Sequence, residues 1–150
     1  MVSSSKSKIY FIADLHLSSS HHHLLKLFHY FIKNILKGND KLYILGDLFE
    51  YSIGEDSTDL VAQEVKELLK KLRERNIHWY FLAGNRDFLW RRKSIQALGG
   101  QLLKEKTVIK LDHQKILLLH GDTLCTLDES YQLLRKKLNQ RWLQNIFLFL

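Results

Sequence analysis

An apolar run that ends in a glycine and an aspartate is the feature that most constrains what this chain can fold into. The run covers residues 42–45 (LYIL), and Gly46 and Asp47 follow it directly. A continuous apolar run is typical of a strand that is buried on both faces of a parallel sheet. Glycine lets the backbone turn sharply or approach another group closely, since it has no Cβ. Because ligands of open α/β sheets bind beyond the carboxyl ends of the strands, Asp47 is expected where a ligand would bind.

The same arrangement occurs at three other places in the chain. Residues 9–13 lead into Asp14 and His16, residues 79–83 lead into Asn85, and residues 116–119 lead into His120. Each apolar run thus brings a carboxylate, imidazole or amide group to its C-terminal end. We therefore expect the function to lie where these strand ends converge.

The spacing of apolar residues predicts an α/β chain. Helical spacing, with apolar residues three and four positions apart, occurs in residues 22–37, 59–75 and 88–98 and from residue 128 or 129 to residue 150. Strands are predicted at residues 8–13, 41–45, 78–83, 101–111 and 115–119, with a tight turn at residues 112–114 joining the last two. A chain of 150 residues corresponds to one domain or to part of one.

Charge and cysteine content limit the partners and the compartment. The net charge is +7, and residues 131–150 hold four basic residues and no acidic one. Such an excess suits nucleic acid, an anionic membrane or an anionic small substrate. Nucleic acid is not expected, because the basic residues are not interleaved with exposed aromatic residues. The single cysteine, Cys125, excludes an intramolecular disulfide and agrees with a reducing compartment. No apolar stretch of about 18 residues is present, so no transmembrane helix is predicted.

The side chains at the strand ends suit a metal site. Asp14 and His16 are two positions apart, a spacing that puts both on one side of an extended segment. Carboxylate, imidazole and amide donors together suit Mn²⁺, Fe²⁺ or Zn²⁺ rather than a thiolate-preferring metal. Two such ions about 3.5–4 Å apart can clamp a phosphoryl group during an in-line displacement. A lone aspartate after a strand is usually a turn former or a helix cap, but four strand ends with matching chemistry favour the metal site.

The motifs at these strand ends resemble those of the calcineurin-like metallophosphoesterases. The chain carries D-x-H at 14–16, G-D at 46–47, G-N at 84–85 and H-G at 120–121, in the same order as that superfamily. The longer strings FIADLHLS, YILGDLFEYSIG, HWYFLAGNRDFL and LLLHGDTLCTLDESYQ are similar to the UDP-2,3-diacylglucosamine diphosphatases of lipid A biosynthesis. Arg86 is a specific part of this resemblance, because most of the superfamily has histidine there.

The resemblance implies an αββα sandwich with a site for two divalent metal ions, with manganese as the expected metal. It assigns Asp14 and His16 to one ion, Asn85 and His120 to the other, and Asp47 to both. These last three residues are then also catalytic.

The resemblance also implies residues that bind the substrate. Asn85 and Arg86 would contact its phosphate region, and Arg86 joins the catalytic set, since its planar fork offers paired donors to a phosphate. Asp128 matches a substrate-binding position of the family, and the alternative for Asp128 is an N-cap of the last helix. Asp87 and Glu50 are expected either to orient ligands or to form local salt bridges.

The activity implied is hydrolysis of the pyrophosphate bond of UDP-2,3-diacylglucosamine, which gives UMP and 2,3-diacylglucosamine 1-phosphate. One alternative is another calcineurin-like phosphoesterase that acts on nucleotides or phosphodiesters, against which Arg86 argues. A second alternative is an inactive remnant, because the Gly-His-x-His segment that supplies two more metal ligands in the family is absent from this sequence. The chain is therefore expected to be the N-terminal portion of a metallophosphoesterase domain.

The segment from residue 131 to residue 150 is expected to begin a helical lid. It combines Arg135, Lys136, Lys137 and Arg141 with an apolar end at residues 146–150. An apolar face beside basic residues is typical of a helix that lies on an anionic bilayer, and a helix packed inside a complete protein is the alternative. With an acylated substrate implied, we expect a peripheral protein at the cytoplasmic face of the bacterial inner membrane.

Overall fold

The computed structural model describes residues 7–50, 59–87, 90–124 and 126–138. Its centre is a four-stranded parallel sheet with the strand order β1-β2-β3-β4. The strands are β1 (Ile9–Ile12), β2 (Lys41–Ile44), β3 (His78–Phe81) and β4 (Gln101–Leu102). The helices between them are α1 (His22–Tyr30), which continues as the π-helical turn η1 (Phe31–Ile35), α2 (Leu60–Glu74) and α3 (Arg92–Ala97).

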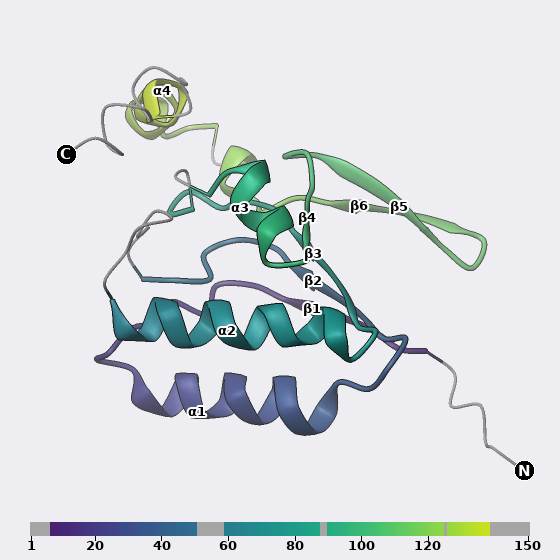
Figure 1. The fold of residues 1–150 in the computed structure, drawn as a ribbon. Helices are drawn as coiled ribbons and strands as arrows, with labels where there is room; N and C mark the ends of the chain where they lie inside the picture. The colour runs from purple at the N-terminus through teal and green to yellow at the C-terminus, as the bar shows by residue number, and fades with distance from the viewer. Residues whose placement is uncertain (1–6, 51–58, 88–89, 125, 139–150) are drawn as a thin grey trace, which may run out of the picture.

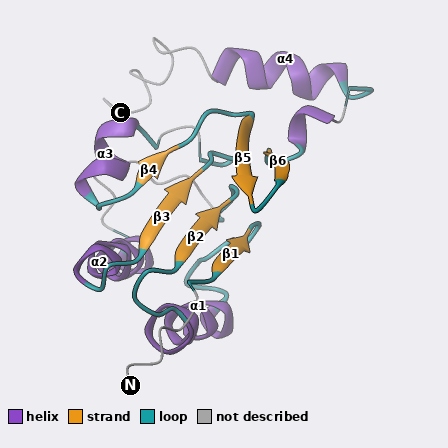
Figure 2. Ribbon diagram, turned by 90° about the vertical axis from the view of Figure 1, so that its right-hand side faces the viewer, coloured by secondary structure: helices purple, strands orange, loops and turns teal. Residues whose placement is uncertain are grey.

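A second sheet and a last helix follow. Strands β5 (Thr107–Leu111) and β6 (Gln114–Leu118) form an antiparallel hairpin. A 3₁₀ turn, η2 (Asp122–Leu124), then leads to α4 (Glu129–Leu138). Helices α1 to α3 lie on one side of the parallel sheet and the hairpin lies on the other, while α4 stands apart from both layers (Figures 1 and 2).

Alternation along the strands divides the core into two parts. Leu42 and Ile44 of β2, with Trp79 and Phe81 of β3, are buried in the large cluster that the helices cover. Successive side chains of a strand point to opposite faces of its sheet, so Tyr43 lies in the smaller cluster with residues of the hairpin. The sheet is thus buried on both faces at β2, as the apolar run predicted.

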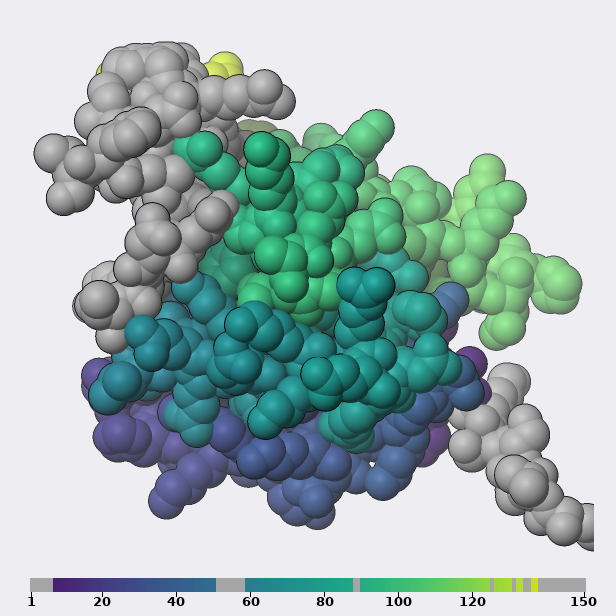
Figure 3. Space-filling model, viewed as in Figure 1, coloured from purple at the N-terminus to yellow at the C-terminus, as the bar shows by residue number. Residues whose placement is uncertain are grey.

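Helix α2 shows why the helical layer forms. Its buried residues recur three and four positions apart, so that one stripe faces the sheet. Asp59 caps its start, since the side chain accepts a hydrogen bond of 2.9 Å from the N–H of Val61. Helices α1 and α2 lie side by side along this face of the molecule, in blue and teal (Figure 3). In the described part of the chain, no helix is long and apolar enough to cross a membrane.

Several boundaries differ from the sequence-based predictions. The predicted helix over 22–37 is α-helical to Tyr30 and π-helical over 31–35. The predicted strand over 101–111 is divided, because the chain leaves the first sheet after Leu102 and enters the second at Thr107. Residue 114 belongs to β6, so the hairpin turn contains residues 112–113. For the predicted helices at 88–98 and from 128 or 129 onward, α3 and α4 are described, whereas residues 88–89 and 139–150 lie outside the described residues.

Candidate metal and phosphate site

The segments that follow β1 and β2 continue side by side beyond the sheet. The N–H of Asp14 donates to the carbonyl of Gly46 over 3.1 Å, and the N–H of His16 donates to the carbonyl of Asp47 over 3.0 Å. A parallel bridge between Leu17 and Phe49 extends this pairing. The pairing brings two of the predicted motifs, D-x-H and G-D, into direct contact.

Left-handed backbone conformations distinguish these residues. The φ angles of Asp14, His16 and Asp47 are 53°, 46° and 50°. The expectation that Asp14 and His16 lie on an extended segment is therefore wrong, because both backbones curl. Positive φ in a residue other than glycine costs free energy and clusters at functional sites. With this backbone, the ligand atoms of the three side chains converge.

The three side chains form a cluster that could hold a metal ion. Each of Asp14, His16 and Asp47 offers one ligand atom, and these atoms lie within 4.8 Å of one another. Asp47 is buried, with 4% of its surface exposed. Nε2 of His16 lies 3.9 Å from Oδ2 of Asp47. A carboxylate held at the centre of such a group is suited to bridge two cations.

The ends of β3 and β6 complete this cluster. Nε2 of His120 lies 3.8 Å from Oδ2 of Asp47, and Nδ1 of His120 lies 2.8 Å from the carbonyl of Leu45. That carbonyl can only accept, so Nδ1 carries the proton and Nε2 presents its lone pair to the site. In the amide orientation that suits its neighbours, Asn85 donates to the Asp47 carboxylate over 2.8 and 3.0 Å. All five predicted metal ligands therefore meet at one place, with His120 supplied by the second sheet.

Close approach of the chain segments requires two glycines. A Cβ on Gly46 would lie 2.5 Å from Nδ1 of His120 and 2.7 Å from Cα of Gly84. A Cβ on Gly84 would lie 2.8 Å from the backbone nitrogen of Asp47. Real Cβ atoms are not found at such distances, so only glycine permits this packing.

Asp87 joins the loop after β2 to the loop after β3. It has no exposed surface, and its Oδ2 accepts hydrogen bonds from the N–H of Asp47 over 2.6 Å and of Gly84 over 3.0 Å. Burial raises the pKa of the Asp87 carboxyl to about 6, and the nearby charge of Asp47 acts in the same direction. The two backbone hydrogen bonds and His120 oppose that rise in the pKa. Of the two roles considered for Asp87, orientation of the site is the one that these contacts support.

Arg86 and Glu50 lie at the open side of the cluster. The N–H of Arg86 donates to Oδ1 of Asp47 over 3.0 Å, and its Nε lies 3.8 Å from Oδ2. Nη1 of Arg86 donates to the carboxylate of Glu50 and, over 2.8 Å, to the Glu50 carbonyl. The Arg86 side chain is 39% exposed, so its guanidinium can be reached by a substrate phosphate.

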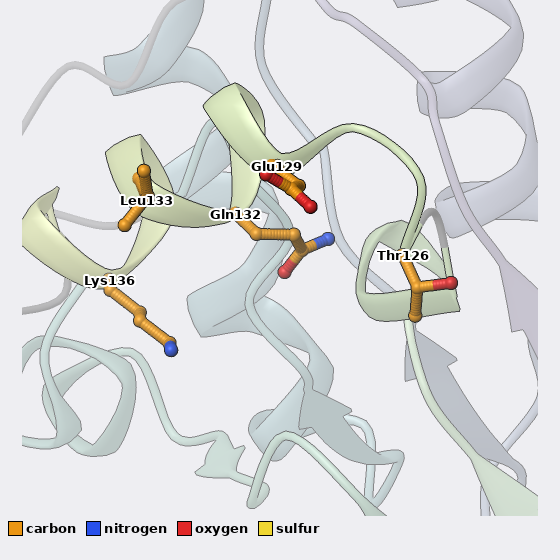
Figure 4. Close-up of a pocket in the computed structure, with 5 residues that line it drawn as sticks. All are labelled: Thr126, Glu129, Gln132, Leu133 and Lys136. Carbon is orange, nitrogen blue, oxygen red and sulfur yellow. The ribbon is translucent and has the colours of Figure 1, made fainter.

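Asp128 lies outside this cluster. It directly precedes α4, and its carbonyl accepts the first helical hydrogen bond, from the N–H of Gln132 over 3.1 Å. This is the N-cap position, which fits the structural alternative for Asp128, while its substrate role stays a prediction. A nearby hollow of about 260 Å³ is lined by Thr126 and by residues of α4, including Glu129 and Lys136 (Figure 4). None of the predicted metal ligands lines it.

Comparison with known proteins gives matches along most of this chain. A model of the calcineurin-like phosphoesterase family matches residues 7–149. The UDP-2,3-diacylglucosamine hydrolase of Haemophilus influenzae is 46% identical over 141 residues, which make up 94% of this chain and 60% of that protein. The proteins of the same name from Histophilus somni and Vibrio cholerae are 45% and 43% identical, over 95% and 91% of this chain and 61% and 57% of theirs. The chain thus spans about 60% of the length of these curated relatives.

Proposed function

The chain belongs to the calcineurin-like phosphoesterase family, and on this basis we propose that its strand-end cluster is the catalytic centre of a metal-dependent hydrolase. The proposed reaction is cleavage of the pyrophosphate bond of UDP-2,3-diacylglucosamine to UMP and 2,3-diacylglucosamine 1-phosphate. Relatives that are 43–46% identical carry the name UDP-2,3-diacylglucosamine hydrolase. The observation that carries the proposal is the meeting of Asp14, His16 and Asp47 within 4.8 Å.

The donor set of the cluster fits divalent cations. Carboxylate, imidazole and amide oxygen ligands suit Mn²⁺, and no thiolate is required. Asn85 would offer its oxygen in the amide orientation that places Oδ1 3.2 Å from Nε2 of His120. We propose that two Mn²⁺ ions are held, one by Asp14 and His16 and one by Asn85 and His120, with Asp47 shared. When bound, such a pair supplies Lewis-acid polarisation of the phosphoryl group.

The protein side chains position the substrate for this chemistry. Arg86 offers a planar set of donors that matches a phosphate, and its exposed surface opens toward the solvent. His120 is fixed in one tautomer by the Leu45 carbonyl, so its Nε2 presents a lone pair to the site, 3.2 Å from the Asn85 amide. The backbone of Asp47 is fixed, because its carbonyl accepts from the N–H of His16 and its N–H donates to Oδ2 of Asp87. Groups held in this way need little rearrangement during the reaction.

Hydrolysis of UDP-2,3-diacylglucosamine by the full-length protein tests this proposal. With added Mn²⁺ the protein should release UMP, and Asp47→Ala should abolish release because it removes the shared ligand. Glu67→Ala is a matched control, since Glu67 is an exposed helical acid that pairs with Lys70. Full activity of the Asp47→Ala protein would refute the proposal, and faster hydrolysis of a soluble nucleotide diester would favour another phosphoesterase activity.

We also propose that the full-length protein associates peripherally with the cytoplasmic face of the inner membrane. Leu124, Leu127 and Leu133 are exposed, and Leu127 is 99% exposed. Lys136 and Lys137 are exposed on the same helix as Leu133. Apolar side chains beside basic ones suit an anionic bilayer, where each basic residue contributes about 1 kcal/mol.

Vesicle flotation tests the membrane proposal. The protein should float with anionic vesicles at low salt and be released at high salt, because screening weakens the attraction. Neutral vesicles serve as the control. Protein that stays in the soluble fraction with anionic vesicles at low salt would show that these residues serve internal packing.

A further inference from the structure

Glu50 lies between His16, a predicted metal ligand, and Arg86, a predicted phosphate-binding residue. The paired segments after β1 and β2 place it there, since the N–H of Glu50 donates to the carbonyl of Leu17 over 3.2 Å. Its side chain is 24% exposed and faces the cluster, where it contacts Arg86 on one side and His16 on the other. Glu50 is therefore more buried than an ordinary surface carboxylate, and it has two side-chain partners instead of one.

Contact with Glu50 determines where the Arg86 guanidinium lies. Nη1 of Arg86 donates both to the Glu50 carboxylate and, over 2.8 Å, to the Glu50 carbonyl. Two acceptors from one residue hold Nη1 of the guanidinium in place. The 39% exposure of the side chain leaves room for a phosphate to approach. Glu50 thus restricts a long, flexible side chain before any substrate arrives.

The second contact of Glu50 is with the imidazole of His16. Nδ1 of His16 lies 3.2 Å from Oε2 of Glu50, a close polar contact that lacks the alignment of a hydrogen bond. The opposite ring nitrogen, Nε2, faces Oδ2 of Asp47 at 3.9 Å. A carboxylate next to the non-ligating nitrogen of a histidine orients the ring and raises its basicity toward a metal. Glu50 itself is not among the three residues whose ligand atoms cluster within 4.8 Å.

From these contacts we propose that Glu50 is a positioning residue that holds both His16 for the metal and Arg86 for the phosphate. The inference rests on the proposed function, which it deepens by linking the metal site to phosphate recognition. It differs from a local salt bridge, because a partly exposed ion pair with no other role would leave metal affinity and substrate binding unchanged.

Metal binding and kinetics of Glu50 variants in the full-length protein separate the two contacts. Glu50→Ala should weaken Mn²⁺ binding, measured by calorimetry or electron paramagnetic resonance, by about 10–100-fold. It should also raise KM on the order of tenfold with a smaller change in kcat, because Arg86 is no longer held. Glu50→Gln keeps the shape and an acceptor for Arg86, so it should restore KM more than Mn²⁺ affinity.

An Arg86→Ala background makes the test specific. There, Glu50→Ala should cause no further rise in KM, because its effect on phosphate binding acts through Arg86. The loss of Mn²⁺ affinity should remain, because it acts through His16. Glu64→Ala is the matched control, since Glu64 also pairs with a histidine, with its Oε1 2.7 Å from Nε2 of His29, and the pair joins α2 to α1. It should change neither quantity.

The outcomes distinguish this inference from the proposed function. Unchanged Mn²⁺ affinity and KM in both Glu50 variants, with a wild-type protein that binds Mn²⁺ and hydrolyses the substrate, would overturn the positioning role alone. A wild-type protein that binds no Mn²⁺ would overturn the proposed function and the inference with it. Circular dichroism identifies any variant that fails to fold, and Glu50→Gln then decides the outcome because it preserves volume.

Discussion

Gly84 is the residue at which a single methyl group should disable the site. In Gly84→Ala the new Cβ would meet the side chain and the backbone nitrogen of Asp47, the latter at 2.8 Å, and Cε1 of His120 at 2.9 Å. The loop after β3 would have to move away from both ligands. We expect a loss of about 1–3 kcal/mol in the free energy of unfolding and a loss of most Mn²⁺ affinity, measured by urea denaturation and calorimetry.

Gly38→Ala provides the control for this substitution. A Cβ on Gly38 would have the carbonyl oxygen of Arg75, at 3.3 Å, as its one close neighbour, far from the metal ligands. Mn²⁺ affinity should therefore be retained. Equal Mn²⁺ affinity in the Gly84→Ala and Gly38→Ala proteins would show that the loop after β3 does not need its close approach to Asp47.

Asp87 makes the stability of the metal-free protein depend on pH. Its pKa is 3.8 in its ordinary state and about 6 in the folded protein, so between these values the folded state binds the proton more tightly than the unfolded chain. The free energy of unfolding should then fall as the pH rises from about 4 to about 6, by up to about 3 kcal/mol. The stabilisation that Asp87 contributes is fully present below pH 3.8 and is lost above about pH 6.

Urea denaturation in EDTA at several pH values measures this effect, with Asp87→Asn as the reference. Asparagine keeps an oxygen that can accept from Asp47 and Gly84 but has no carboxyl proton. The free energy of unfolding of the wild type should therefore fall relative to that of Asp87→Asn as the pH rises. Parallel pH profiles for the two proteins would contradict the raised pKa of Asp87.

At the residue scale, the sequence predicted which side chains meet but not how the backbone presents them. The strand-end pattern identified Asp47, Asn85 and His120 because residue type and position after a strand are local signals. The left-handed conformations of Asp14 and His16 are not local signals. Such strain persists only when surrounding contacts determine it, and here those contacts are hydrogen bonds to a segment about 30 residues away.

The π-helical turn η1 is held by an arginine from another element. Nη1 of Arg75 donates to the carbonyl of Ile32 over 2.5 Å, and Nη2 donates to the carbonyl of Leu36 over 2.6 Å. These hydrogen bonds satisfy carbonyls at the end of the helical segment. Arg75→Ala should lower the free energy of unfolding by about 1.5–3 kcal/mol without changing Mn²⁺ affinity.

Chemical denaturation of Arg75→Ala beside Lys71→Ala tests this contact. Lys71 is an exposed residue of α2, the helix that Arg75 directly follows, so its removal controls for lost charge. Equal stability of the two variants would show that Arg75 contributes no more than a solvated lysine. A selective loss in Arg75→Ala would show that the end of η1 depends on the end of α2.

At the element scale, the same contact lies where one predicted helix differs from the structure, at the π-helical turn over residues 31–35. Apolar spacing over residues 22–37 correctly indicated a helical segment. Spacing cannot reveal that Arg75, some 40 residues away, donates hydrogen bonds to carbonyls at the end of this segment. The division of the predicted strand at 101–111 has a similar cause. The N–H of Leu103 still donates to the carbonyl of Phe81 over 2.7 Å. The chain then crosses to the other sheet. The local alternation of apolar and polar residues cannot indicate such a change of partner strand.

At the scale of the whole molecule, the site joins two layers. Asp14, Asp47 and Asn85 follow strands of the parallel sheet, whereas His120 follows β6 of the hairpin. A cation bound by the folded protein and not by the unfolded chain should raise stability by about 2.7 kcal/mol at a free concentration 100 times its Kd. Thermal unfolding with MnCl₂ and with EDTA measures this gain. It should be absent in Asp47→Ala, and an equal gain in that variant would place Mn²⁺ elsewhere.

The hairpin rests on the parallel sheet through a small buried cluster of Tyr43, Leu82 and Leu118. The hydrogen bond between His120 and the Leu45 carbonyl lies at the same seam. Among the described residues, the other apolar side chains packed against this cluster are only partly buried, whereas the cluster under the helices is much larger. The hairpin should therefore detach transiently while the helical side stays closed, and its amides should exchange with deuterium sooner. Because His120 belongs both to this seam and to the cation cluster, added Mn²⁺ should slow exchange along β5 and β6, although the hairpin contributes a single predicted ligand.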